Sequence, residues 1–586
     1  MRIILPVLAL TAATPTSAGF VEDTLFPFLE TAEPTLSFDG PTETADGKRW
    51  SNVILRGTEE GGVRLDWIEE SVSGEKTTLM FSENGVIFAE EDGTEVILAM
   101  MRLSGVVWTI QEDNKGLAHE VNANTILFDF TEQDGNADGY LTLSDLTAAV
   151  DVDFGNSYVV QGLGSLAQIE LKMRDMEDAG DELSVILSDI EIRQDSDIDA
   201  ELFERLENAD VEFSSIEDVQ AALSGASKSR FGVDEIAVAY GSVENDVTSA
   251  EFVTRNLEGR SEVDLDGDLL GISLEGAVDA VAGSLQSVPV NGTFELSEYD
   301  LAFRSAIVRE DLPEFVENIE AGRPEALSAL ALRYEVEAGE TKLNGTFEED
   351  GVAGSVEFVS GPASEVIAIE DGRFLFEILT EGFDGTFALS TLSDEAFAAS
   401  LNKLDISLAM PLVPSESNEP DELTFIFRVL QAVASEAVWS LFDAEGTVPR
   451  DPVNLNIDIA GWGEMLGALE EGRDFYEVFR VEGARINTFE LSGGGAEASA
   501  SGETLLDLSS GVPRGDGAFS ISLKGVTDLI GRLANLGIVP PEANLGLRGM
   551  LGAFARPVGE DHYVSEIELL PDGQILTNGV PLPLGR

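Results

Sequence analysis

Hydrophobic and polar residues alternate along much of this chain, a pattern that is typical of β-strands with one apolar face. Between residues 453 and 459, every second residue is aliphatic and the residues between them are Asn or Asp. Similar alternation occurs far away in the sequence, at 126–130 and at 299–303. The pattern therefore predicts strands along the whole chain, each with one buried face.

Glycine residues separate these runs and supply the turns that antiparallel strands require. With 58 glycines in 586 residues, a turn can follow each strand of ordinary length. We therefore predict a mainly β fold, in which one or more long antiparallel sheets meander along the chain and can curve. A few amphipathic helices are expected to pack on these sheets.

Hydrophobic residues at helical spacing interrupt the strand pattern at a few places. Helices are predicted at 199–209, at 312–321 and in the stretch that follows Pro420. In that last stretch the apolar residues at helical spacing are Ile426, Leu430, Val433, Ala437 and Leu441.

A short helix is also predicted near the C-terminus. Asp528 can cap its first turn, and Gly537 is placed to end it. The pair Pro540-Pro541 then enforces a break in the chain.

The length of 586 residues exceeds what one hydrophobic core supports, so several packing units are expected. Composition shifts in the acidic stretch 193–230 and in the Pro/Ser/Asn-rich segment 411–420 mark the candidate boundaries. We predict an N-terminal β-rich unit at 19–192 and a middle β-rich unit with helical insertions at 193–410. A C-terminal β/α unit is predicted at 411–586.

The N-terminus has the features of a secretory signal peptide at residues 1–18. Arg2 precedes an apolar stretch at 3–13, and Thr16-Ser17-Ala18 is a small-residue cleavage site. Export to the periplasm is therefore predicted, with secretion as the alternative. No later stretch is long and apolar enough for a transmembrane helix after signal cleavage, and without Cys no disulfide is available.

The charge is strongly one-sided, with 110 acidic and 34 basic residues and a formal net charge of -76. Such a surface repels phosphate backbones and anionic lipid head groups, which excludes nucleic acid as a partner. It suits divalent cations, basic partners, or solubility in a salty medium. The sequence leaves the oligomeric state open.

Catalytic chemistry that needs a histidine must use His119 or His562, the two present. Alternation places His119 on one face of a strand with Leu117 and Val121, and Asp561 can hold the neighbouring His562. No recognisable motif surrounds either, so a surface or structural role is predicted for both.

The common enzyme signatures for serine, metal or nucleotide chemistry do not occur. The glycines of 162–167 mimic a dinucleotide fingerprint, but the residues after them alternate as a strand. A carboxylate pair of the kind that hydrolases use cannot be singled out among so many acidic residues. We therefore predict no catalytic residues and no cofactor site.

One loop matches the calcium-binding loop of an EF-hand, at residues 134–145. Its candidate ligands are Asp134, Asn136, Asp138, Tyr140 through its carbonyl, and Asp145 in place of the usual Glu. The alternative is a hairpin turn between strands at 125–131 and 140–146, because both flanking stretches alternate as strands. Calcium is thus the one metal that the sequence suggests.

The C-terminal third carries motifs of a known group. They are Trp439-Ser440-Leu441-Phe442-Asp443 and Val448-Pro449-Arg450-Asp451-Pro452, followed by the strand at 453–459. This run resembles a family of long exported Gram-negative proteins known only as a domain of unknown function. The resemblance implies no activity and no catalytic residues.

The closing residues, with the turns Asp572-Gly573 and Asn578-Gly579 before a short apolar tail, are also similar to exported AsmA-like envelope proteins. That resemblance implies long, curved β-sheets whose apolar inner face can shelter lipid chains. The usual N-terminal membrane anchor of that group is missing, which argues against a bridge between two membranes.

The leading functional hypothesis is a non-enzymatic periplasmic protein of the cell envelope that shelters a lipid or another apolar ligand. The first alternative is a calcium-dependent binding or surface module that uses the loop at 134–145. The second is a hydrolase with a carboxylate pair. Envelope components or lipids are the expected partners in the first case.

Overall fold

The computed structural model describes residues 35–56, 61–91, 94–112, 116–131, 137–154, 157–175, 181–199, 225–242, 248–264, 269–287, 289–321, 323–349, 351–393, 395–414, 420–467, 475–507 and 514–582. The predicted signal peptide and nearly all of the helix predicted at 199–209 lie outside these residues.

The chain divides into two compact units, Met1–Asn291 and Gly292–Arg586. Residue 193, a predicted boundary, lies inside strand β11 (Glu182–Asp199), and residue 411 is the last residue of β21 (Phe397–Pro411). The division into three β-rich segments remains a prediction.

The first unit begins with short antiparallel strands around a small hydrophobic core. β3 pairs with β2, β4 and β5, so the chain folds back on itself here. The core consists of Trp50, Val53, Ile68, Leu79, Ile110 and Leu117, each at most 4% exposed. Burying such side chains stabilises the fold by about 1.5–3 kcal/mol each. The strands are β1 (Thr35–Glu43), β2 (Gly47–Arg56), β3 (Gly61–Ser73), β4 (Lys76–Phe81), β5 (Asn84–Glu91), β6 (Thr94–Ser104) and β7 (Val107–Glu112).

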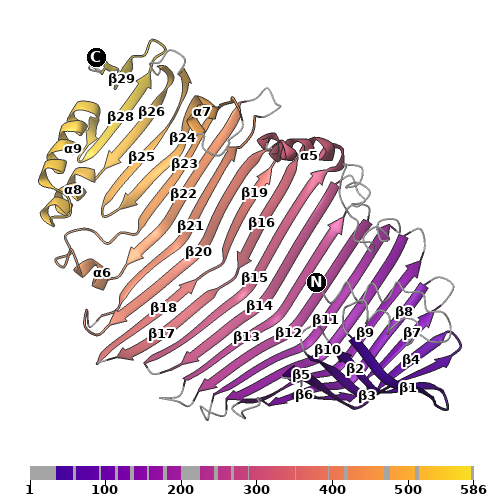
Figure 1. Ribbon diagram of the computed structural model, residues 1–586. Helices are drawn as coiled ribbons and strands as arrows, with labels where there is room; N and C mark the ends of the chain where they lie inside the picture. Colours follow the sequence, from indigo (N-terminus) through magenta and orange to yellow (C-terminus); the bar gives the residue numbers. More distant parts are fainter. Residues whose placement is uncertain are drawn as a thin grey trace. The chain divides into compact units, whose positions relative to one another are not determined.

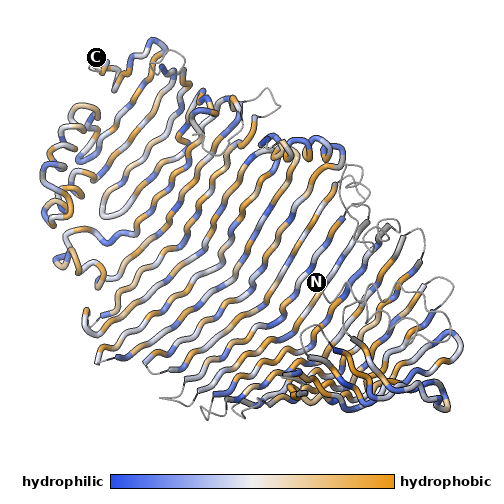
Figure 2. Tube along the Cα trace, in the orientation of Figure 1, coloured by the Kyte–Doolittle hydropathy of each residue, from blue (hydrophilic) through white to orange (hydrophobic). Residues whose placement is uncertain are grey.

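Long strands form the rest of this unit, and each pairs antiparallel with the next in the chain (Figure 1). Hydrophobic and hydrophilic residues alternate along them (Figure 2). The predicted meander is therefore confirmed here. Its strands are β8 (Gly116–Thr131), β9 (Ala137–Phe154), β10 (Ser157–Asp175), β11, β12 (Gly225–Ser242), β13 (Thr248–Asp264) and β14 (Leu269–Gln286).

Every second one of these strands contains an Asp or Asn in the left-handed conformation. Asp145 in β9, Asp189 in β11 and Asn256 in β13 have φ of 52°, 49° and 51°. Asn and Asp tolerate this conformation better than other non-glycine residues. The apolar positions shift by one residue at each of them, for example from Leu141 and Leu143 before Asp145 to Leu146 after it in β9. The apolar side chains therefore stay on the same face of the strand before and after the left-handed residue.

The second unit is also an antiparallel sheet. The first part of β20 pairs with β19 and its last part with β18, while β20 to β26 follow each other in chain order (Figure 1). Its strands are β15 (Val290–Val308), β16 (Leu330–Ala338), β17 (Thr341–Glu349), β18 (Val352–Ser360), β19 (Ala363–Glu370), β20 (Arg373–Leu389), β21, β22 (Asp421–Ala434), β23 (Val453–Met465), β24 (Phe479–Gly493), β25 (Ala496–Asp507), β26 (Arg514–Lys524), β27 (Arg556–Gly559), β28 (His562–Leu569), β29 (Ile575–Thr577) and β30 (Val580–Pro581).

The helices are short and lie between strands. The helix predicted at 312–321 is confirmed as α5 (Leu312–Glu320). The helix α9 (Pro541–Phe554), which begins at the second of the two prolines, was not predicted. Pro at the first helical position is favourable, because its missing N–H has no partner there in any case. The other helices among the described residues are η2 (Arg309–Asp311), η3 (Pro324–Ser328), α6 (Glu436–Ser440), α7 (Phe475–Val478) and α8 (Val526–Asn535).

The helix predicted after Pro420 is wrong over most of its length. Residues 421–434 form strand β22, and only α6 is helical. Residues four apart share a face in a strand as well as in a helix, so the spacing of Ile426 and Leu430 fits both. The antiparallel neighbours β21 and β23 form backbone hydrogen bonds with this segment on both sides, which stabilises the strand over the helix.

The cap of α8 also differs from the prediction. Asp528 lies within the first turn, and the capping carboxylate comes from Asp561, just before β28. The Asp561 side chain accepts a hydrogen bond from the Asp528 amide at 3.0 Å and another from the Thr527 hydroxyl. Gly537, at φ 76°, does follow the helix, as predicted.

The fold is mainly β, antiparallel and meandering, with few helices, as the alternation predicted. The closing turns are also confirmed, since Asn578 and Gly579 have positive φ between β29 and β30. Within the part of the chain that the structure describes, no helix has the length and hydropathy to cross a membrane.

Candidate functional site

Three rows of hydrophobic side chains run across one face of the sheet in the second unit. Side chains that are register partners on adjacent antiparallel strands project from the same face. Starting from Phe303, Leu301 and Tyr299 on β15, the partners can be followed from strand to strand to β28.

The rows are nearly continuous. The first is Phe303, Tyr334, Ile367, Phe376, Leu408, Phe425, Ile459, Ile486, Gly502, Phe519 and Ile567. The second is Leu301, Val336, Glu365, Ile378, Ile406, Phe427, Ile457, Phe489, Ala500, Ile521 and Ser565. The third is Tyr299, Ala338, Ala363, Thr380, Leu404, Val429, Leu455, Leu491, Ala498, Leu523 and Tyr563. We refer to them together as the three-row face.

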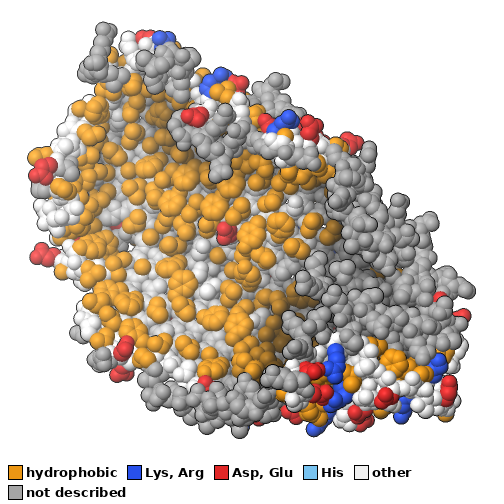
Figure 3. Space-filling model, in the orientation of Figure 1, with side chains coloured by type: hydrophobic (Ala, Val, Ile, Leu, Met, Phe, Trp, Pro, Cys, Tyr) orange, Lys and Arg blue, Asp and Glu red, His pale blue; other side chains and the backbone are white. Residues whose placement is uncertain are grey.

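The three-row face is not covered by a second layer of described residues. Ile459 is 37% and Leu491 42% exposed, and the other hydrophobic members are partly exposed. Figure 3 shows hydrophobic side chains gathered over this part of the sheet. At a strand spacing of about 4.8 Å the rows extend about 50 Å, which makes the face larger than the apolar patches of ordinary soluble proteins. The prediction that each strand buries its apolar face is therefore wrong here.

The opposite face of the same strands is polar. Arg428 on β22 donates to Asp405 on β21 at 3.0 Å and lies 3.5 Å from Asp458 on β23. Its Nε also donates to the Asn456 side chain at 3.1 Å. Such ladders of ion pairs and amides keep this face hydrated, so the sheet has one apolar and one polar side.

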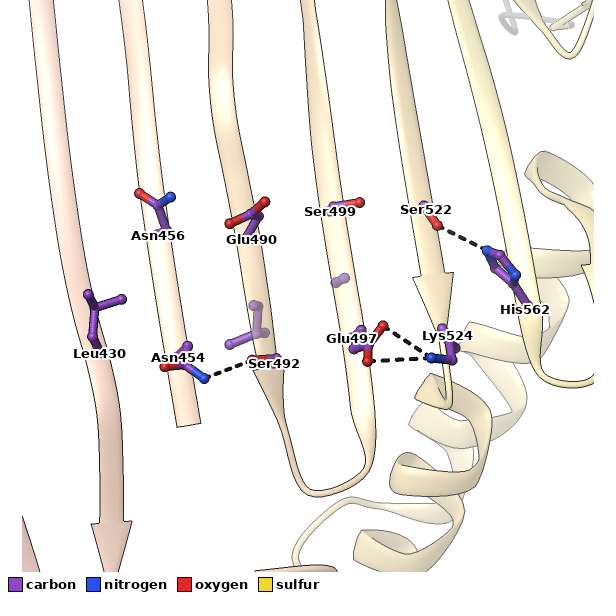
Figure 4. A pocket seen from close by; sticks show the side chains of 12 residues that line it. Leu430, Asn454, Asn456, Glu490, Ser492, Glu497, Ser499, Ser522, Lys524 and His562 are labelled. Carbon is purple, nitrogen blue, oxygen red and sulfur yellow. Dashed lines mark hydrogen bonds and ion pairs between the residues drawn. The ribbon is translucent and has the colours of Figure 1, made fainter. Parts of the chain in front are cut away.

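A shallow pocket of about 840 Å³ lies on that polar face, over β22 to β28 (Figure 4). Cross-strand bonds occupy several of its polar groups: Asn454 donates to Ser492 at 3.1 Å, and Lys524 lies 3.3 Å from Glu497. Its lining is Leu430, Asn454, Asn456, Glu490, Leu491, Ser492, Glu497, Ala498, Ser499, Ser522, Lys524 and His562.

His562 lies in this pocket with its Nε2 atom 3.1 Å from the Ser522 hydroxyl. The expected partner, Asp561, instead caps α8. A serine beside a histidine is the start of a nucleophilic site, which also needs a group that orients the ring and free donors for an oxyanion. Among the described residues no carboxylate bonds to His562, and the backbone around Ser522 is engaged in pairing with β25 and β28. Sequence reasoning finds no signal of this contact, because its partners are 40 residues apart.

His119 has the structural role that was predicted. Its ring is buried in the first unit, and its Nδ1 accepts a hydrogen bond from Trp108 Nε1 at 3.2 Å. Burial lowers the pKa of His119 from 6.5 to about 4, so the ring is neutral at physiological pH.

The described candidate calcium ligands are spread along one strand. Asp138, Tyr140 and Asp145 lie along the single strand β9, in which five residues span about 17 Å. Asp134 and Asn136 lie outside the described residues. β8 and β9 pair antiparallel up to Thr131 and Asp138, as the hairpin interpretation expects, and calcium binding at this loop stays a prediction. No cluster of three or more potential metal ligands occurs among the residues that the structure describes.

The motif residues of the C-terminal third form a compact structural cluster after α6. The fully buried Asp443 carboxylate accepts bonds from the Thr447 and Val448 amides and from Arg450 at 2.6 Å. Burial opposes its ionisation, but these donors hold the pKa of Asp443 well below its usual range. The Arg450 guanidinium also stacks 4.4 Å from the ring of Trp439. The cluster fixes the connection between β22 and β23 and offers no reactive group.

Residues 386–586 match the model of a family described as "Uncharacterized protein conserved in bacteria (DUF2125)". The matched region begins in β20 and includes β21 to β28, which carry most of the three-row face. The resemblance expected for the C-terminal third is thereby confirmed, and the family brings no known catalytic residue. No curated protein matches the chain.

Proposed function

We propose that this chain, whose residues 386–586 match a family without a described activity, is a non-enzymatic envelope protein that shelters the hydrocarbon chains of lipids. The three-row face is the binding surface. Export through the predicted signal peptide would place the protein in the periplasm.

The observation that carries this proposal is the predominance of apolar side chains on the three-row face. Of its 33 positions, six carry a polar side-chain group, namely Glu365, Ser565, Thr380, Tyr299, Tyr334 and Tyr563. Ser565 already donates to the Phe554 carbonyl at 2.7 Å, and the tyrosine rings are themselves largely apolar. A partner that forms no hydrogen bonds fits this surface best, and a hydrocarbon chain is such a partner.

Charge favours single lipids over adsorption to a bilayer. The net charge of -76 repels anionic head groups, so the whole protein gains little from lying on a membrane surface. An acyl chain forms no hydrogen bonds in the bilayer, so it loses none when it moves onto the apolar strands. The resemblance to the AsmA-like group supports the same proposal, because that group is expected to shelter lipid chains on apolar sheet faces.

Lipid extraction from the purified protein tests the proposal. The mature chain is exported in bacterial cells, purified without detergent, and extracted for mass spectrometry of its lipids. Repeated preparations should contain lipid in a reproducible ratio to protein. The double variant Phe427→Ser with Ile457→Ser places two hydroxyls at neighbouring positions of the second row and should lower that ratio several-fold.

The matched control is Ile426→Ser, on the same strand but on the polar face, where its register partners are Ser407 and Asp458. It should leave the lipid ratio unchanged while circular dichroism shows that all variants fold. Wild-type preparations without lipid would refute the proposal. Covalent labelling of Ser522 by a fluorophosphonate would contradict its non-enzymatic part.

A further inference from the structure

One carboxylate interrupts the three-row face. Glu365 on β19 is the single charged member of the rows, and its register partners are Val336 and Ile378. Its neighbours on the same strand and face are Ala363 and Ile367. The side chain is partly buried, and no described residue forms a hydrogen bond or an ion pair with it. Any ligand that covers the face must therefore also cover this carboxylate.

A ligand that is only hydrocarbon would bury this carboxylate without a partner. Such burial is costly, because the charge loses its water and gains no hydrogen bond in return. A ligand that carries a cationic N–H donor at this position avoids that cost and adds a charge-assisted hydrogen bond. Glu365 therefore selects among apolar ligands according to the group that they present to β19.

We infer that the three-row face takes an amphiphile with an ammonium group, which pairs with Glu365 while its chain lies along the second row. The inference rests on the function proposed above and specifies the ligand class. From Glu365 the row continues through Ile378, Ile406, Phe427, Ile457 and Phe489, about 24 Å of hydrophobic surface. In the other direction the second unit offers two members, Val336 on β16 and Leu301 on β15. The longer hydrophobic run within this unit lies toward β24, so the chain is directed that way.

A pair of probes with equal chain length tests the inference. Dodecylammonium and dodecanoate are titrated below their micellar concentrations against the mature protein, with displacement of Nile red as the readout. The buffer is at pH 7.5 with 0.3 M NaCl, which screens the long-range attraction of any cation to this acidic protein. Wild type should bind dodecylammonium at least about tenfold more tightly than dodecanoate. Glu365→Leu should abolish this preference, and Glu365→Gln should reduce it.

Glu337→Gln is the matched control. Glu337 is on β16, but it projects from the polar face, where its register partners are Asp300 and Ser364. It removes the same charge and should keep the preference.

Three results would overturn the inference, and they differ in what else they affect. Equal binding of both probes by wild type and Glu365→Leu would remove the ammonium selectivity and leave lipid sheltering intact. Binding of neither probe would refute the inference together with the proposed function. A dimer in sedimentation velocity that binds a probe only on dissociation would show that a second copy, and not an amphiphile, occupies the face.

Discussion

His119 lies on β8 with one ring nitrogen bonded to Trp108 and the other, Nε2, without a partner among the described residues. Because Nδ1 accepts the bond from Trp108, the ring must carry its proton on Nε2. Protonation of Nδ1 would break that bond and place a charge in a buried site. The sequence indicated on which face of the strand His119 lies, but not that its ring is shielded from solvent. That shielding arises where β7 pairs with both β4 and β8.

Acid should therefore weaken the first unit through His119. The folded pKa of about 4 lies below the ordinary value of 6.5, so the unfolded chain binds this proton first as the pH falls. Stability that is complete above about pH 6.5 is lost between there and pH 4, amounting to about 2 kcal/mol by pH 5. Urea unfolding of wild type and His119→Phe at pH 8 and pH 5 measures the difference. An equal loss in both proteins would exclude His119 as the cause.

Asp443 and Arg450 show why recognisable sequence motifs need not be functional sites. Their residue types and spacing suggested a family before any geometry was known. In the structure they hold one connection in place, through buried bonds and through the stacking of Arg450 on Trp439. The motif marks a connection whose conformation depends on these particular side chains. The candidate binding surface lies elsewhere, in alternating strands that carry no motif.

At the level of strands, alternation predicted the fold well where the period was unambiguous, as in β23. It failed at β22, because an apolar spacing of four is shared by helices and strands and both faces of that strand contain hydrophobic residues. Composition favoured the strand, since Thr424, Phe425, Ile426, Phe427 and Val429 are β-branched or aromatic.

The left-handed Asp and Asn residues coincide with phase changes of the alternation, which the prediction from sequence did not use. Asp189 is exposed and has φ 49° in the middle of β11. Asp189→Val should lower the free energy of unfolding by about 1 kcal/mol, because a β-branched residue is strained in this conformation. Asp189→Gly should be tolerated, since glycine adopts positive φ without strain. Denaturant unfolding of the purified variants measures both.

Asp197→Val is the control for this prediction. Asp197 is exposed on the same strand with ordinary extended backbone, where valine is favourable. It should be neutral or slightly stabilising. A loss as large as that of Asp189→Val would show that removal of the charge, and not the backbone conformation, causes the effect.

For the molecule as a whole, the candidate site could be predicted only in part. The alternation showed that apolar faces exist on β15 to β28, and the resemblance suggested that such faces shelter lipid. The rows themselves depend on register between strands that are tens of residues apart, which one sequence does not reveal. Glu365 is significant only because Val336 and Ile378 lie beside it in the folded sheet.

The net charge of -76 leads to a prediction for the entire chain. Most of the ion pairs among the described residues are exposed and contribute little, so the excess of carboxylates repels itself in the compact state. Raising NaCl from about 0.01 M to 0.3 M shortens the Debye length from about 30 Å to below 10 Å and should raise the urea midpoint. MgCl₂ and CaCl₂ at equal ionic strength should act alike, because screening does not distinguish them. A saturable stabilisation by calcium alone, removed by Asp134→Ala, would instead show a specific cation site.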